Sequence, residues 1–147
     1  MCIRDSYSTW FGVGTNASGC VTSLSLEGNG LTGTLPEAIG DLSELRLLNV
    51  SGNFISGTIP SSIGNLTMSE NMNFSSNNFS GVIPDTFANL TNLQTFIVNS
   101  NSLTGSIPAD LGGLSLLRLL HLDDNNLTGS IPPELSLIHI SEPTRPY

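Results

Sequence analysis

A 24-residue repeat constrains the fold of this chain more than any other feature of its sequence. Five asparagines recur at this interval with no insertion between copies: Asn29, Asn53, Asn77, Asn101 and Asn125. Two apolar residues spaced two apart precede each asparagine, and a third apolar residue follows at +2. Gly follows at +4, Leu or Ile at +6 and Pro at +7. Such self-similarity predicts a solenoid, because each unit can bury its apolar residues only against its neighbours.

Each position of the repeat has a local physical reason. Apolar pairs such as Leu24 and Leu26 alternate with polar residues, which predicts a short half-buried strand. The asparagine then stands at a bend, where its amide can bond backbone groups that the bend leaves unpaired. We therefore expect the five asparagines to form one internal ladder. Glycine permits the next turn, and proline is suited to begin a short helical turn.

This spacing resembles the plant-type leucine-rich repeat, LxxLxLxxNxLxGxIPxxLGxLxx, over residues 21–135. The resemblance implies an α/β fold, a right-handed solenoid with a parallel β-sheet on its concave face. Short and largely 3₁₀ helical turns are expected on the convex side. The third copy departs most, with Ser69, Met72 and Phe74 where Leu is usual. Ser69 is expected to remove a core anchor and to make that strand the loosest.

The two ends fall outside the repeat. Residues 7–20 resemble part of the N-terminal cap of such proteins, and Trp10 and Val13 are expected to cover the apolar edge of the first repeat. Cys20 is either bonded to a cysteine outside the chain or a free buried thiol. Residues 1–6 and 136–147 break the 24-residue register and resemble translated sequencing-adapter DNA. They are therefore expected to be foreign, so that Cys2 is no partner for Cys20 and the chain is a fragment.

Composition excludes several classes of function. The net charge is −8 with only 4 basic residues, which disfavours nucleic acid and anionic membrane surfaces. No apolar run is long enough to cross a membrane, and no signal peptide is recognisable. No phosphate loop, catalytic triad or kinase signature occurs, so we expect neither an enzyme nor a cofactor.

The residues that point outward from the predicted concave sheet are candidates for ligand binding. They are mostly small, polar and neutral: Glu27, Asn49, Ser51, Asn73, Ser75, Ile97, Asn99, His121, Asp123 and Asp124. His121 and Asp123 share a face by the period of two residues in a strand. A metal site there is conceivable, but solvated binding residues are the favoured interpretation.

Seven Asn-x-Ser/Thr sequons suggest a secreted glycoprotein. Asn49 and Asn73 are expected to point from the concave sheet, where a glycan would block it. The remaining candidates for glycosylation are Asn16, Asn65, Asn78, Asn89 and Asn126.

The resemblance implies a non-catalytic recognition module at the cell surface or outside the cell, similar to receptor-like kinase ectodomains and polygalacturonase-inhibiting proteins. Protein, peptide or glycan ligands are the expected partners, with a kinase or membrane span possible outside the fragment. The alternative is an ice-binding structural protein, since two hydroxyl columns follow the asparagines. One column is Thr32, Ser56, Ser80, Thr104 and Thr128, and the other is Thr34, Thr58, Val82, Ser106 and Ser130.

Overall fold

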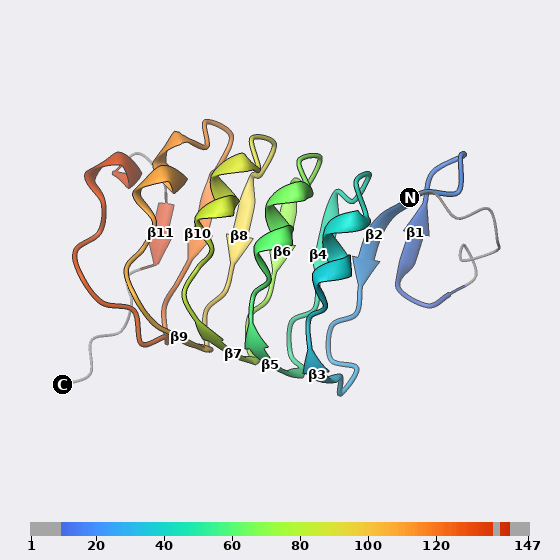
Figure 1. Ribbon diagram of the computed structural model, residues 1–147, viewed down its shortest axis with the longest axis horizontal. Coiled ribbons are helices and arrows are strands. Elements are labelled where there is room, and N and C mark those ends of the chain that lie inside the picture. Colours follow the sequence, from blue (N-terminus) through green and yellow to red (C-terminus); the bar gives the residue numbers. More distant parts are fainter. Residues whose placement is uncertain (1–9, 137–138, 142–147) are drawn as a thin grey trace.

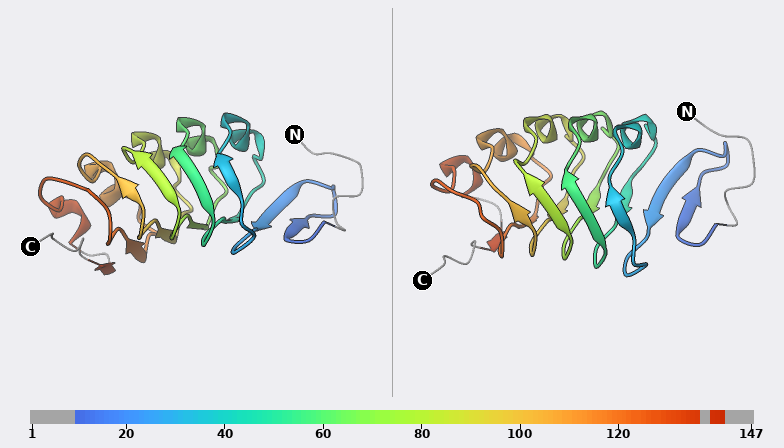
Figure 2. Two further views of the ribbon diagram at one scale, coloured as in Figure 1. Left: turned by 90° about the horizontal axis from the view of Figure 1, so that it is seen from below. Right: turned by 60° about the horizontal axis from the view of Figure 1, so that its bottom comes forward.

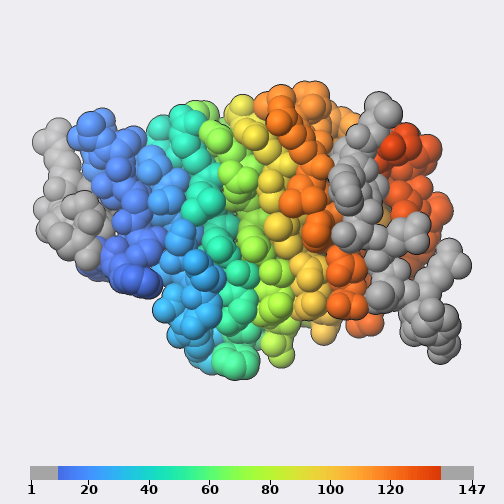
Figure 3. All heavy atoms as spheres, turned by 180° about the vertical axis from the view of Figure 1, so that it is seen from behind, coloured from blue at the N-terminus to red at the C-terminus, as the bar shows by residue number. Residues whose placement is uncertain are grey.

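The chain forms a curved solenoid of stacked coils (Figure 1). A computed structural model describes residues 10–136 and the backbone of residues 139–141. Short helical turns lie along the outer side of the arc and strands along the inner side (Figure 2). Seen as spheres, the coils lie against one another as successive bands (Figure 3).

The concave face is a seven-stranded sheet with the order β1-β2-β4-β6-β8-β10-β11. Its strands are β1 (Val13–Thr15), β2 (Val21–Ser25), β4 (Leu47–Asn49), β6 (Asn71–Asn73), β8 (Thr95–Ile97), β10 (Leu119–His121) and β11 (His139–Ser141). The strands of the repeats pair in parallel at the interval of the repeat, as in Leu48↔Met72↔Phe96. Only β1 is antiparallel. Strand β11 also pairs in parallel with β10, but at a shorter step than the repeat, with Leu119 opposite His139.

A second parallel sheet lies where each coil turns, and the sequence pattern did not predict it. It consists of β3 (Thr32–Thr34), β5 (Phe54–Thr58), β7 (Asn78–Gly81) and β9 (Ser102–Leu103). Partners in this sheet do not occupy equivalent places in the repeat: Thr34 pairs with Ser56, whereas its equivalent in the next coil is Thr58. The coils are therefore offset from one another on this side, although they are in full register on the concave side.

The convex side carries one 3₁₀ turn in each coil: η2 (Glu37–Asp41), η3 (Ser61–Asn65), η4 (Asp85–Asn89), η5 (Ala109–Gly113) and η6 (Pro133–Leu135). The predicted proline stands directly before each of the first four turns, in extended backbone. Its fixed φ suits this entry, where no backbone N–H is required. The predicted leucine-rich-repeat solenoid, with a parallel sheet and short 3₁₀ turns, is confirmed.

The apolar positions of the repeat form one continuous core. Phe74, Phe79, Phe87 and Phe96 are all fully buried, and Phe87 stacks on Phe96 with ring centroids 4.4 Å apart. Ser69 stands in the core of the third coil in place of an apolar residue. Its side chain is fully buried, and its Oγ donates to the backbone oxygen of Leu45 at 2.8 Å.

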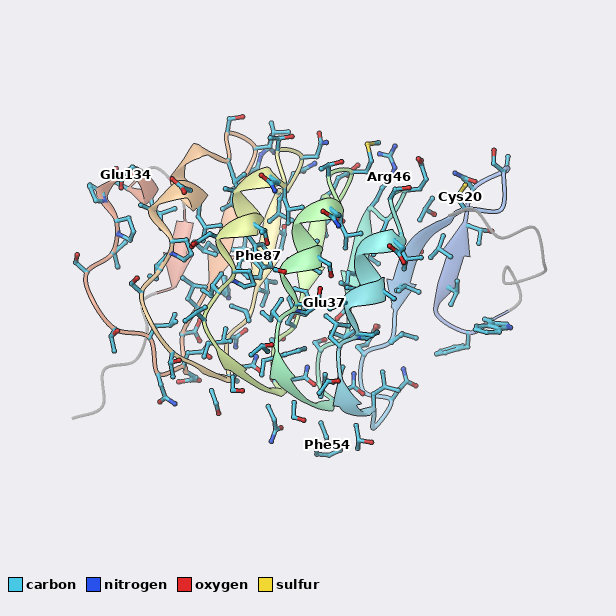
Figure 4. The ribbon with its side chains drawn as sticks, viewed as in Figure 1. Cys20, Glu37, Arg46, Phe54, Phe87 and Glu134 are labelled. Atoms are coloured by element: carbon cyan, nitrogen blue, oxygen red, sulfur yellow. The ribbon has the colours of Figure 1, made fainter. Side chains whose placement is uncertain are left out.

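At the N-terminal end, the predicted cap covers the first coil only in part. Val13 lies opposite Leu24 in the β1–β2 pair, as a cover should. Trp10 is 60% exposed, so it does not shield the apolar edge as predicted. Cys20, labelled in Figure 4, is buried. It is disulfide-bonded, which excludes the free thiol. The expectation about Cys2 concerns a residue outside the described part of the chain.

Candidate functional site

The concave sheet presents a row of polar side chains on neighbouring strands. We define the concave surface as the ten candidate residues named from the sequence. Asn49, Asn73, Ile97 and His121 end adjacent strands at equivalent positions, and each is half-buried. Glu27 and Asp124, near the two ends of this surface, are exposed. The central part of the concave surface is therefore neutral, and its charges lie at the ends.

Two asparagines of this surface are held by the serine that follows two residues later. Asn49 Oδ1 accepts from Ser51 Oγ at 2.8 Å and from Ser51 N at 3.1 Å. Asn73 Oδ1 accepts from Ser75 in the same way, at 2.7 Å and 3.0 Å. These hydrogen bonds restrict the two asparagine side chains, and such restriction lowers the entropy that a side chain loses in any intermolecular contact.

A column of left-handed backbone stands just before the asparagine ladder, and sequence reasoning missed its role. Ser76, Ser100 and Asp124 have φ of 53°, 56° and 53°, and Gly28 and Gly52 occupy the same place in earlier coils. This conformation is costly for residues other than glycine. In the sequence, Gly28 and Gly52 were the signal for this conformation, because glycine adopts a positive φ without steric cost. Asp124 therefore adopts the left-handed conformation that this turn requires, and it also has an exposed carboxylate.

The charged groups near the C-terminal end do not gather into a metal site. Among the described residues, no three His, Cys, Asp or Glu side chains come together as cation ligands. Asp123 Oδ1 is buried and accepts no hydrogen bond from the residues that the structure describes. Elsewhere, Arg46 and Glu70 form an ion pair of 2.8 Å between adjacent coils, with 53% and 34% of their side chains exposed. Such exposure makes the pair a minor contributor to stability.

The asparagine ladder joins each bend to the bend before it. Asn53 Nδ2 donates to the backbone oxygen of Leu26 in the first coil and to that of Val50 in its own. Asn53 Oδ1 accepts from the backbone N–H groups of Asn29 and Leu31. Asn77, Asn101 and Asn125 repeat this arrangement, each accepting one N–H from the preceding coil.

Asn29 departs from the ladder. Its side chain is exposed, and among the described residues Nδ2 donates only to Glu27 O in its own coil, at 3.2 Å. The physical reason is its position, since no repeat coil precedes the first one in the described chain. Four of the five asparagine side chains therefore bond to the preceding coil, whereas that of Asn29 bonds within its own coil.

The sequons divide by exposure. Asn49 and Asn73 are half-buried on the concave surface, with the hydrogen bonds described above. The five remaining candidates have exposed side chains: Asn16, Asn65, Asn78, Asn89 and Asn126.

The hydroxyl columns that suggested an ice-binding surface are not aligned across the second sheet. Thr32 pairs with Phe54 instead of Ser56, and Ser56 pairs with Asn78 instead of Ser80. The hydroxyl columns therefore run diagonally over the strands. Phe54 and Val82 interrupt the array with apolar side chains that are 65% and 58% exposed. The hydroxyl groups therefore form an oblique array that these two apolar side chains interrupt.

An apolar pocket of about 260 Å³ opens beside the first coil. Its lining includes Leu24, Leu26, Leu31, Leu35 and Ile39, together with the threonines of β3. In the inner coils, the equivalents of Leu31 are buried by the preceding coil, as Ile55 and Phe79 show. Sequence reasoning expected Trp10 to close this face.

Taken together, the in-register coils, the shared core and the parallel inner sheet define a solenoid protein built from stacked repeats. Sequence comparison agrees: models described as leucine rich repeat match residues 20–42, 44–66 and 70–127. The chain belongs to the leucine-rich repeat family, and its plant-type pattern is confirmed by the structures that it resembles.

Three solved structures show the likeness. A chain of the BIR3–SERK2 complex from Arabidopsis thaliana is 31% identical, with a TM-score of 0.85 over 96% of this chain and 81% of that one. The ectodomain of the Arabidopsis thaliana receptor kinase SOBIR1 is 29% identical, with a TM-score of 0.82 over 91% and 80%. The ectodomain of GASSHO1/SCHENGEN3 from Arabidopsis thaliana, in complex with CASPARIAN STRIP INTEGRITY FACTOR 2, is 35% identical, with a TM-score of 0.85. That match covers 92% of this chain but only 17% of the longer receptor.

No curated protein matches the sequence. Within the described residues, no helix combines the length and apolar character needed to span a membrane.

Proposed function

We propose that the chain is a non-catalytic recognition module that acts at the cell surface or outside the cell and binds protein or peptide ligands through its concave surface. The observation that carries the proposal is the row of half-buried side chains on in-register parallel strands, polar except for Ile97. The ladder and core lie beneath these side chains, so the surface residues can vary without disturbing the fold.

The similar structures support this proposal. Those above are receptor-kinase ectodomains or belong to complexes between such proteins, and one is in complex with a separately named factor. A location outside the cell and a ligand of protein or peptide type follow by analogy. A glycan is an alternative ligand for the same surface, because the amide and hydroxyl groups of the surface can also form hydrogen bonds with sugar hydroxyls.

Within this chain, the concave surface is smaller than one side of a standard interface between folded proteins. Five strands at about 4.8 Å spacing, each showing about five residues, give a footprint of roughly 400 Å². A standard interface between folded proteins buries about 800 Å² on each side. An extended peptide that crosses the strands needs no more than this surface offers.

The test is a selection from a random peptide library displayed on phage, followed by two matched substitutions. Ile97→Asp places a charge in the middle of the concave surface, and Val82→Asp places the same charge on the exposed flank. We expect selected peptides to lose at least tenfold in affinity for Ile97→Asp and to keep their affinity for Val82→Asp. Peptides that respond equally to the two variants would place binding elsewhere, and a selection without binders would count against the function itself.

A further inference from the structure

Phe54 has the most exposed large apolar side chain among the described residues of the five repeats, at 65% (Figure 4). It stands directly after a ladder asparagine, where the other coils carry Gly30, Asn78, Ser102 and Asn126. The repeat does not require an aromatic residue at this place. A single exposed ring is common on protein surfaces and indicates nothing by itself. What the ring can bind depends on the residues next to it in the second sheet.

Asn78 is a neighbour of Phe54 on the outer face of the second sheet. Strands β5 and β7 pair in parallel with Ser56 opposite Asn78, and Phe54 lies two residues before Ser56. These three side chains are exposed, whereas Ile55 and Phe79, which follow Phe54 and Asn78, are buried. A strand spacing of about 4.8 Å and a rise of about 3.3 Å per residue place the Cα atoms of Phe54 and Asn78 about 8 Å apart. An aromatic side chain can bridge such a diagonal.

Asn78 is also the first residue of a sequon, Asn78-Phe79-Ser80, which is an acceptor of N-linked glycans. The middle residue of the sequon anchors it to the core. The ring of Phe79 is fully buried and meets Phe74 edge-on, with ring centroids 5.7 Å apart. Because side chains alternate along a strand, a buried Phe79 holds Asn78 outward. The core therefore directs Asn78 to the face that carries Phe54.

We propose that Asn78 carries an N-linked glycan and that the ring of Phe54 is the surface against which its first N-acetylglucosamine packs. This inference rests on the proposed location outside the cell, because glycans of this kind are added in the secretory pathway. In the transfer, Asn78 Nδ2 loses a proton and bonds the anomeric carbon of the sugar. The polyprenyl diphosphate of the lipid-linked sugar donor is the leaving group.

The chemistry of the two rings is complementary. One face of a β-linked N-acetylglucosamine consists of axial C–H groups, and the face of an aromatic ring carries partial negative charge. Contact between the two faces also removes apolar area from water. The nearby side chains of Thr32, Ser56 and Ser80 are small and hydroxylated, so they leave room for the sugar and can bond to its polar groups.

Asn126 provides an internal control, because it is a sequon asparagine at the same place two repeats later. Its backbone N–H donates to Leu103 O at 2.8 Å, so Asn126 lies beside β9 in the preceding coil. That coil carries Ser102 where the coil before Asn78 carries Phe54. Both asparagines are exposed. The two glycan sites therefore differ in whether an aromatic ring stands next to them.

The test uses the full chain, secreted from eukaryotic cells with ¹³C-labelled sugars and trimmed by an endoglycosidase to one N-acetylglucosamine at each site. Two-dimensional NMR then reports ring-current shifts, with Asn78→Gln and Asn126→Gln assigning the signals. We expect upfield-shifted C–H signals for the sugar on Asn78 and ordinary signals for the sugar on Asn126. Phe54→Ser should remove the shift, and Ser102→Phe should create one at Asn126.

Thermal melting should report the same contact. Asn78→Gln, which removes the glycan, should lower the melting temperature by about 3 °C in the original chain and by less than about 1 °C in Phe54→Ser. Asn126→Gln should have only the smaller effect in the original chain and the larger one together with Ser102→Phe. Because Phe54 is exposed, we expect Phe54→Ser to fold normally.

Three results would overturn the proposal. The first is a secreted chain in which Asn78 carries no glycan, and the second is a sugar on Asn78 without a ring-current shift. The third is a shift that survives Phe54→Ser. None of these readouts involves the concave surface, whose peptides are selected on the chain without glycans and tested by Ile97→Asp. Either proposal can therefore fail while the other stands.

Discussion

Replacing Asn77 with alanine tests the ladder at the asparagine whose side chain makes the most buried hydrogen bonds. Asn77 Nδ2 donates to the backbone oxygens of Val50 and Phe74, at 2.9 and 3.2 Å, and Oδ1 accepts from Ile55 N at 3.0 Å. All three of these bonds are buried. Alanine leaves the three backbone groups without this partner, and each buried group left unsatisfied costs about 1–3 kcal/mol.

A loss of about 3 kcal/mol in the free energy of unfolding is therefore expected for Asn77→Ala, the lower end of the summed range. Urea denaturation followed by far-ultraviolet circular dichroism measures it. Asn29→Ala is the matched control, because the same amide is exposed there and its one bond is local. We expect that variant to change the free energy of unfolding by less than about 0.5 kcal/mol. Equal effects of the two substitutions would refute the structural role assigned to the buried amides.

Three further predictions test packing and modification. Gly64→Ala should destabilise the chain, since its Cβ would lie 2.5 Å from Thr86 Cβ, whereas Gly113→Ala meets nothing within 4 Å and should be neutral in the same denaturation assay. Phe96→Ala should cost about 3–5 kcal/mol in unfolding free energy, because it removes a fully buried ring that contacts two others. After expression through a secretory pathway, peptide mass mapping with and without glycosidase should find glycans at the exposed sequons and none at Asn49 or Asn73. The exposed sequons are Asn16, Asn65, Asn78, Asn89 and Asn126.

The 24-residue pattern predicted the coil, the concave strands and the 3₁₀ turns because each depends on residues within one repeat. The proline and the apolar residue at +10 determine the helical turn within one repeat. The strand is predicted by the alternation of apolar and polar residues before the asparagine. The second sheet was missed because its strands are short, mostly contain glycine and pair out of step with the repeat. The offset depends on how neighbouring coils pack against one another, and the sequence of a single repeat does not determine this packing.

The environments of Asn29 and Ser69 were also not predicted, for a related reason. Asn29 has the same sequence context as the other ladder asparagines, yet it is exposed because no repeat coil precedes it in the described chain. By its place in the repeat, Ser69 counts as a lost apolar anchor, but the backbone oxygen of Leu45 accepts its hydroxyl in the core. In both cases the outcome depends on a neighbouring coil rather than on the residue itself. For Asn49 and Asn73, the outward direction was predictable but the bonds to serine were not.

Hydrogen exchange at single residues tests the central claim, that buried amides join successive coils in register. The backbone N–H groups of Ile55, Phe79 and Leu103 donate to the side chains of Asn77, Asn101 and Asn125. The account predicts that these three protons exchange among the slowest in the chain and that Asn77→Ala selectively accelerates Ile55. Fast exchange of all three in the original chain, or an Ile55 rate that Asn77→Ala leaves unchanged, would contradict it.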